Sequence, residues 1–185
     1  MIIPYKSILE ANELKNPMKV GRHDTYVVTQ AGLLSLARFF LPIDKRNPGK
    51  ESKILNLLSP KGDVPFPEGT YYVQGRSLLP ISPQEEIDQS RPVLILRKFI
   101  EGSALREGEP LTAYQFSRLS EVTRRGLDYG ISGLINSPKD VVIRTATQAP
   151  FVICFKNAQI RPHIPLEEYE GEFSRLRQMF PIVRD

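Results

Sequence analysis

The sequence predicts an α+β fold with a mostly antiparallel sheet of about five to six strands and two or three packed helices. Segments with strand-like and helix-like patterns follow one another without a regular strand–helix–strand alternation, which argues against a parallel sheet. Two neighbouring strand-like segments are joined by only three residues, which favours an antiparallel hairpin. The content of 41% hydrophobic and 25% charged residues is that of an ordinary globular chain.

Six segments are expected to form strands, because each is rich in β-branched, aromatic or leucine residues and is bounded by proline or glycine. They are residues 25–29, 54–58, 70–74, 93–100, 141–147 and 151–156. The last two are the pair expected to form the hairpin. Prolines cluster in residues 60–92, so that stretch is predicted to be turns and extended chain around the single short strand 70–74.

The clearest helix is predicted to open at Thr112. Thr112 and Gln115 have the spacing of a capping box, in which each residue accepts a hydrogen bond from the other's backbone N–H. Apolar residues then recur at intervals of three and four as far as Leu134, as on one face of a helix. Gly130 and Gly133 are expected to end this helix.

Two more helices are expected. One begins near Pro165 and stops at Pro181, with glutamates in its early turns and Arg175 and Arg177 later, an order that complements the helix dipole. The other is shorter, covers residues 30–41 and ends at Pro42.

The chain of 185 residues is expected to form a single domain, 1–185, with any boundary in the proline-rich stretch 60–92. Its one cysteine excludes a disulfide within the chain. The first residues lack the pattern of a signal peptide, and no apolar run approaches the roughly 20 residues that span a bilayer. We therefore expect a cytoplasmic protein without a membrane partner.

The sequence offers few catalytic signals, and we expect no cofactor and no metal. Phosphate-binding glycine motifs and the nucleophile-elbow motif are absent from it. One cysteine and two histidines are too few for a structural zinc site. Cys154 lies in an apolar strand segment and is interpreted as a core residue. His23, next to Asp24, and His163 are the candidate acid–base residues.

Positive charge is concentrated in the first third of the chain. Residues 1–62 carry ten Lys/Arg against five Asp/Glu, whereas residues 63–185 carry fifteen against sixteen. A cationic surface favours polyanionic partners, because contacts to phosphates release counterions. The polar loop 44–53 holds much of this charge. The predicted nucleic-acid-binding residues are Arg22, Lys45, Arg46, Lys50 and Lys53.

These observations predict a non-catalytic binding module that contacts nucleic acid through its basic first third. A first alternative is a protein–protein adaptor that offers the proline-rich segment 60–92, with Phe66 exposed, as an extended recognition strip. A second alternative is an enzyme of an unrecognised family that uses His23. The sequence leaves open whether the partner is nucleic acid or protein, and it does not fix the oligomeric state.

Overall fold

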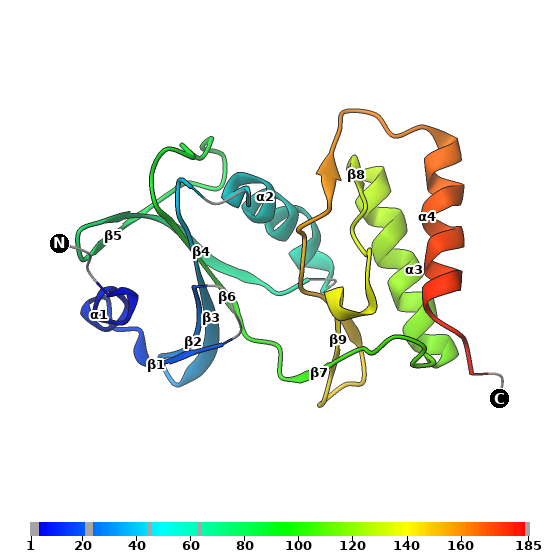
Figure 1. Ribbon diagram of the computed structural model, residues 1–185, viewed down its shortest axis with the longest axis horizontal. Helices are drawn as coiled ribbons and strands as arrows, with labels where there is room; N and C mark the ends of the chain where they lie inside the picture. The colour runs from blue at the N-terminus through cyan, green and yellow to red at the C-terminus, as the bar shows by residue number, and fades with distance from the viewer. Residues whose placement is uncertain (1–3, 21–23, 44–45, 63, 184–185) are drawn as a thin grey trace. The chain divides into compact units, whose positions relative to one another are not determined.

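The computed structural model describes residues 4–20, 24–43, 46–62 and 64–183. The chain divides into two compact units (Figure 1), Met1–Asn56 with Phe66–Phe99 and Leu57–Pro65 with Ile100–Asp185. The predicted α+β fold is confirmed: the described residues form four helices, a six-stranded antiparallel sheet and two smaller sheets. The expectation of a single domain stays a prediction. No helix within the described ranges is both long and apolar enough to cross a membrane.

The first unit is built on the six-stranded sheet, in the order β1-β2-β3-β6-β4-β5. Its elements are α1 (Tyr5–Ala11), β1 (Lys15–Lys19), β2 (Thr25–Gln30), β3 (Leu33–Phe40), β4 (Pro67–Gln74), β5 (Ser77–Pro80), β6 (Val93–Lys98) and α2 (Pro48–Leu58), of which Leu57 and Leu58 fall in the second unit. All strand pairs in this sheet are antiparallel. Strand β6 lies between β3 and β4, and its side chains are buried on both faces of the sheet, against α1 on one face and α2 on the other, which explains its unbroken apolar run.

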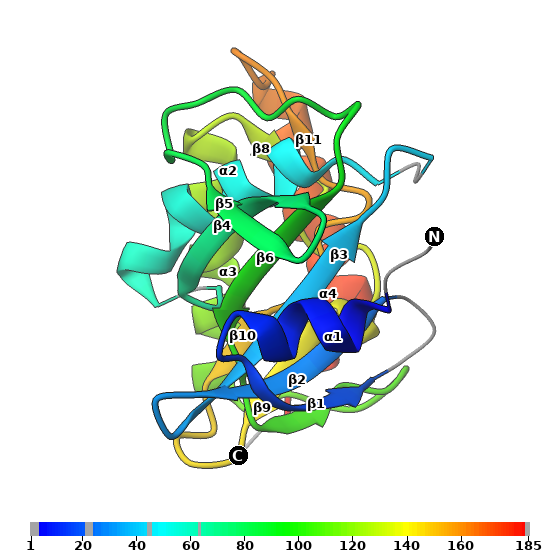
Figure 2. The same cartoon turned by 90° about the vertical axis from the view of Figure 1, so that its left-hand side faces the viewer.

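Helices α1 and α2 cover opposite faces of this sheet, and Figure 2 shows α1 in front of the strands. Ile8 and Leu9 of α1 join a buried cluster that includes Phe39 of β3 and Leu94 of β6. The ring of Tyr5 stacks on that of Phe39, with 4.2 Å between centroids. Alternate residues of β3 point the other way, toward α2, because side chains alternate along a strand.

The helix predicted over 30–41 is wrong, since these residues form most of the β2–β3 hairpin. Ala31 and Gly32 both have positive φ, 48° and 80°, which suits the tight two-residue turn that joins antiparallel strands. Ser35, Ala37 and Phe39 are then buried at alternate positions. Leucine and alanine favour helices in isolation, but here the turn and the period-two burial decide the structure.

The strand predicted over 54–58 is also wrong, because these residues lie in α2. The side-chain oxygen of Asn47 accepts the N–H of Lys50 at 2.9 Å, and Pro48 occupies the first helical position. Buried Glu51, Leu55 and Leu58 then recur at helical spacing. The segment 60–92 holds two paired strands, β4 and β5, where one was predicted.

The second unit packs α3 (Ala113–Asp128) beside α4 (Leu166–Met179), as Figure 1 shows. Its strands are β7 (Gly102–Ala104), β8 (Ile131–Ser132), β9 (Val141–Arg144), β10 (Pro150–Val152) and β11 (Gln159–Ile160), and its 3-10 turns are η1 (Ser59–Lys61) and η2 (Pro138–Asp140). They form a sheet β10-β9-β7 and a two-stranded pair β11-β8. Two short sheets therefore accompany the helices of this unit.

Several sequence predictions are confirmed in this second unit. Both hydrogen bonds of the capping box at Thr112 and Gln115 are present. Gly130 follows the end of α3 with φ of 75°, and a Cβ there would lie 2.1 Å from the carbonyl oxygen of Arg161. The helix after Pro165 and the antiparallel hairpin β9–β10 are also present, although both strands are shorter than predicted.

Candidate functional site

The most buried charged cluster in the described residues joins α2 to the centre of the sheet. Glu51 of α2 accepts two hydrogen bonds from Nη1 of Arg38 on β3, at 3.2 and 3.0 Å to its two carboxylate oxygens. Nη1 of Arg97 on β6 lies 3.6 Å from Oε1 of the same carboxylate. Glu51 is 6% exposed and Arg97 2% exposed, so these charges interact at low dielectric.

The strand register explains how these side chains come together. Leu36 of β3 pairs with Arg97 of β6, and Arg38 lies two residues further along β3, so both arginines are on the face that α2 covers. Beside them, the hydroxyl oxygens of Ser52 on α2 and Thr70 on β4 are 3.2 Å apart. The cluster therefore fixes the position of α2 against β3, β4 and β6.

The predicted nucleic-acid-binding residues are only partly described. Arg22 and Lys45 lie outside the described residues. The guanidinium of Arg46 lies 5.1 Å from the centroid of the Phe40 ring and donates to the backbone oxygen of Phe39 at 3.5 Å.

Lys50 and Lys53 are not in a loop, as predicted, but on α2, which begins at Pro48. Lys53 is exposed and Lys50 half-buried. Residues three apart on a helix are neighbours, so the two ammonium groups belong to the same face of α2. Lys50 and Lys53 are therefore the two residues of the predicted nucleic-acid-binding set that the structure places on one helix face.

The other sequence interpretations concern His23, His163, Phe66 and Cys154. His23 lies outside the described residues, and His163 is exposed in the segment before α4. Phe66 is 58% exposed, as the adaptor hypothesis expected. Cys154 is half-buried two residues beyond β10, and not in the core of a strand as predicted. The strand ends early because its pairing with β9 stops at Val152.

Two side chains of helix α4 form hydrogen bonds with the turn that precedes β9. The carboxylate of Glu172 accepts the N–H of Gly133 at 2.9 Å, and Arg175 donates to the side-chain oxygen of Asn136 at 3.0 Å. Within the turn, Oδ2 of Asp140 accepts the N–H groups of Asn136 and Ser137, both at 3.0 Å. The carboxylate of Asp140 is therefore fixed immediately before the hairpin β9–β10.

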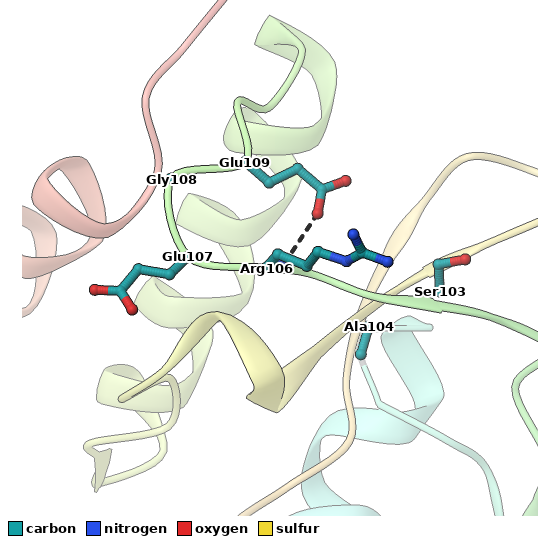
Figure 3. Close-up of a pocket in the computed structure, with 6 residues that line it drawn as sticks. All are labelled: Ser103, Ala104, Arg106, Glu107, Gly108 and Glu109. Atoms are coloured by element: carbon teal, nitrogen blue, oxygen red, sulfur yellow. Dashed lines mark hydrogen bonds between the residues drawn. The ribbon is translucent and has the colours of Figure 1, made fainter.

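An open hollow of about 510 Å³ lies beside β7 (Figure 3). It is lined by Ser103, Ala104, Arg106, Glu107, Gly108 and Glu109. In Figure 3 the guanidinium of Arg106 extends toward Ser103, whereas Glu107 points away. The carboxylate of Glu109 accepts the backbone N–H of Arg106 at 2.9 Å. The hollow is polar and exposed, so a ligand there would remain largely hydrated.

Strand β7 is an edge of the sheet β10-β9-β7. The N–H of Leu105 donates to the oxygen of Val141 in β9, so the N–H and C=O groups of Gly102 and Ala104 point away from β9. All three residues of β7 are exposed. An edge of this kind is able to accept a further extended strand.

Sequence reasoning missed the Arg38–Glu51–Arg97 cluster, although a signal was present. Arg38 and Arg97 each interrupt an apolar strand at a position where the period-two pattern predicts burial. A buried arginine needs a carboxylate partner, and a search for that partner would have led to a buried helix. Because residues 54–58 were predicted to form a strand, the helix that carries Glu51 was not recognised.

The sequence matches no protein-family model and no curated protein. Within the described ranges, no three His, Cys, Asp or Glu side chains are grouped as metal ligands would be. What the chain does is therefore inferred from its own side chains and their geometry.

Proposed function

We propose that this chain is a non-catalytic binding module whose units resemble those of a protein kinase in which catalytic positions have been replaced. The observation that carries the proposal is the ion pair between Arg38 on the third strand and Glu51 on the helix that follows. Protein kinases pair a lysine on their third strand with a glutamate on helix αC, and that lysine also contacts the nucleotide phosphates. This is an analogy at the level of the fold.

Arg38 stands where protein kinases have the lysine, and this difference changes the role of the ion pair with Glu51. The guanidinium of Arg38 meets both oxygens of Glu51, and Arg97 approaches the same carboxylate. Arginine and lysine are not interchangeable at such a site, because the guanidinium is always charged and is more weakly hydrated than an ammonium group, which suits it to buried ion pairs. The pair in this chain is thus suited to holding α2 in place.

The second unit supports the non-catalytic part of the proposal. Kinases carry a catalytic loop H-R-D-L-x-x-x-N, whose Asp accepts the proton and whose Asn binds Mg²⁺, and later a D-F-G whose Asp binds Mg²⁺. With Asp140 in the Asn position, buried Ile135 takes the place of the proton-accepting Asp. After β10, Cys154-Phe155-Lys156 stands where D-F-G is expected. An apolar side chain and a thiol replace two essential carboxylates.

The test is a phosphoryl-transfer assay of the full chain with Mg²⁺ and γ-labelled ATP, and casein as the acceptor. We expect no incorporation into casein or into the chain itself above the rate without protein, because the proton-accepting carboxylate is missing. An active kinase measured in parallel provides the positive control. Incorporation that follows this chain through size-exclusion chromatography would contradict the proposal.

Nucleic acid is the partner that the charges favour. The observation behind this second proposal is that Lys50 and Lys53 share one face of α2, at the end of the chain's basic first third. Arg46 precedes the same helix. Lysines so placed make phosphate contacts that do not depend on base sequence.

Replacing Lys50 and Lys53 together with Glu is expected to weaken binding to labelled DNA and RNA. The slope of log K against log salt should shrink by about one for each lysine that contacts a phosphate. Fluorescence anisotropy measured from about 50 mM salt upward gives both the affinity and the slope. The matched control replaces Lys15 and Lys139 with Glu, which removes the same charge from two exposed lysines elsewhere.

If the control pair loses as much affinity as the α2 pair, binding follows net charge, and the proposal of a defined face is wrong. If the unaltered chain does not bind at the lowest salt, nucleic acid is not its partner.

A further inference from the structure

Strand β7 differs from the other edge strands of the two larger sheets in the described residues. An edge strand exposes backbone N–H and C=O groups, and natural proteins usually protect such strands with prolines, lysines, bulges or a covering segment. Strand β7 contains no proline and no lysine, and all three of its residues are exposed. Its backbone is therefore accessible to a further strand.

The edge strands β1 and β10 are protected by their own residues. Strand β1 contains Lys15, Pro17 and Lys19, and its pairing with β2 is irregular between Lys15 and Met18. Strand β10 begins at Pro150, which has no N–H to offer, and it lies against α3. Neither strand presents a regular row of free donors and acceptors.

The edge strand β5 is protected by the side chain of Asn12. The amide oxygen of Asn12 accepts the N–H of Leu78 at 3.3 Å, and its nitrogen donates to the backbone oxygen of Arg76 at 2.7 Å. Pro80, the last residue of β5, has no N–H. A side chain thus takes hydrogen bonds that an added strand would otherwise form, and β7 has no equivalent in the described residues.

The free backbone groups of β7 belong to Gly102 and Ala104. Because the N–H of Leu105 donates to the oxygen of Val141, the hydrogen bonds to β9 fall on the residues that alternate with these two. The N–H and C=O groups of Gly102 and Ala104 point away from β9, and no hydrogen bond joins them to another described residue. They form a short row of donors and acceptors that an antiparallel or parallel strand can pair with.

This row is fixed in position before any partner binds. A Cβ on Gly102 would lie 2.1 Å from the carbonyl oxygen of Ile143, so only glycine lets β7 lie this close to β9. The row ends at Arg106, whose N–H is already accepted by the carboxylate of Glu109 at 2.9 Å. A preformed edge costs less conformational entropy to pair than a mobile loop does.

The charges around β7 indicate which kind of strand it pairs with. The segment 101–109 carries three glutamates against one arginine, and all four side chains are exposed: Glu101, Arg106, Glu107 and Glu109. A second copy of this segment brings the same excess of negative charge, which opposes self-pairing, whereas lysines and arginines are attracted. The open hollow of about 510 Å³ beside the strand gives a partner's side chains room (Figure 3).

We propose that β7 binds an extended segment of a partner protein that carries lysine or arginine next to the paired residues. The segment adds a strand to the sheet β10-β9-β7, and its backbone pairs with Gly102 and Ala104 while its basic side chains lie near the glutamates. The edge belongs to the second unit and the nucleic-acid face to the first, so this proposal does not depend on nucleic-acid binding.

The test uses amide chemical-shift titrations of the full ¹⁵N-labelled chain with the peptide acetyl-Lys-Val-Thr-Val-Lys-amide. One control peptide has glutamates in place of the lysines, and a second is methylated on its three central amide nitrogens, which removes donors and keeps charge. Saturable shifts of the Gly102 and Ala104 amides are expected with the basic peptide. Both controls are expected to bind at least about tenfold more weakly.

Ala104→Pro is expected to weaken binding of the basic peptide at least about tenfold, because proline removes an N–H that only an added strand uses. The matched control is Ala104→Val, which keeps this N–H and is expected to bind as the unaltered chain does. Circular dichroism confirms that each variant is folded. If Ala104→Pro does not fold, the methylated peptide on the unaltered chain tests the same hydrogen bonds.

Four results would each overturn the proposal. They are equal binding by folded Ala104→Pro, equal binding of the methylated peptide, equal binding of the acidic peptide, and no saturable shift with the basic peptide up to about 10 mM. Shifts of Gly102 and Ala104 that depend on protein concentration without peptide assign the edge to a second copy of the chain, and they overturn it as well.

Discussion

Replacing Glu51 with Gln is expected to lower the free energy of unfolding by about 3–5 kcal/mol, the usual cost of removing one partner from a buried ion pair. Two guanidiniums, those of Arg38 and Arg97, meet this carboxylate, and Arg97 is almost fully buried. Glutamine has nearly the same shape, so the loss comes from charge and not from a cavity. The carboxamide also supplies an N–H₂ group that competes with the arginines as a donor.

Urea unfolding followed by circular dichroism measures this change. The matched control is Glu10→Gln, because Glu10 forms an exposed ion pair with Lys6 on α1, and such pairs contribute roughly 0–1 kcal/mol. If both variants lose less than about 1 kcal/mol, the buried cluster does not hold α2 as inferred.

The parts of the fold that the sequence predicted are those in which local chemistry decides the structure. The capping box at Thr112 and Gln115 needs only four residues to form, and it is present. The hairpin β9–β10 was predicted because a short connection between two apolar segments favours their antiparallel pairing. Pro165 and the acidic residues after it also marked a helix start correctly.

The two errors in the predicted elements have different causes. Residues 33–40 contain leucine and alanine, but they form a strand because neighbours pair with them on both sides. Residues 54–58 are apolar enough for a strand, but the cap at Asn47 and Pro48 begins a helix that contains them. The first error therefore reflects sheet pairing between distant segments, and the second reflects a helix cap that the sequence analysis overlooked.

The candidate sites were harder to predict than the fold. The pairing of Arg38 with Glu51 depends on the register of β3 and on the face of α2, and neither follows from one residue's neighbours in sequence. The bulge at Glu68 in β4 is likewise a mismatch with a distant strand, because Pro67 pairs with Arg97 of β6 whereas Gly69 pairs with Leu96. The basic residues were visible from charge alone, but the place of Lys50 and Lys53 on one face of α2 follows only from the structure.

Replacing Phe39 with Ala is expected to cost about 3–5 kcal/mol, as large-to-small changes in a core do. The side chain of Phe39 is 1% exposed and belongs to the cluster beneath α1. Its ring stacks on Tyr5 and meets Tyr26 edge-on at 6.1 Å. Removing it leaves a cavity that these two rings cannot fill without losing their own contacts.

The same variant tests whether the chain is one domain. Helix α2 runs from Pro48 to Leu58, whereas the division between the two units falls after Asn56, so one continuous helix belongs to both. If α2 transmits unfolding, Phe39→Ala lowers hydrogen-exchange protection in α3 and α4 as well as in the sheet of the first unit. Leu119→Ala, a core change in α3, is then expected to lower protection in that sheet by the same reasoning.

Native-state hydrogen exchange, read residue by residue, separates the two outcomes. Protection lost in both units from either variant means one cooperative domain, because a single opening exposes all of it. Protection lost only in the unit that carries the change means two domains, and the single-domain prediction is then wrong. In that case the helix must fray near the division, so the amides of Leu57 and Leu58 would exchange with the second unit while those of Ile54 and Leu55 exchange with the first.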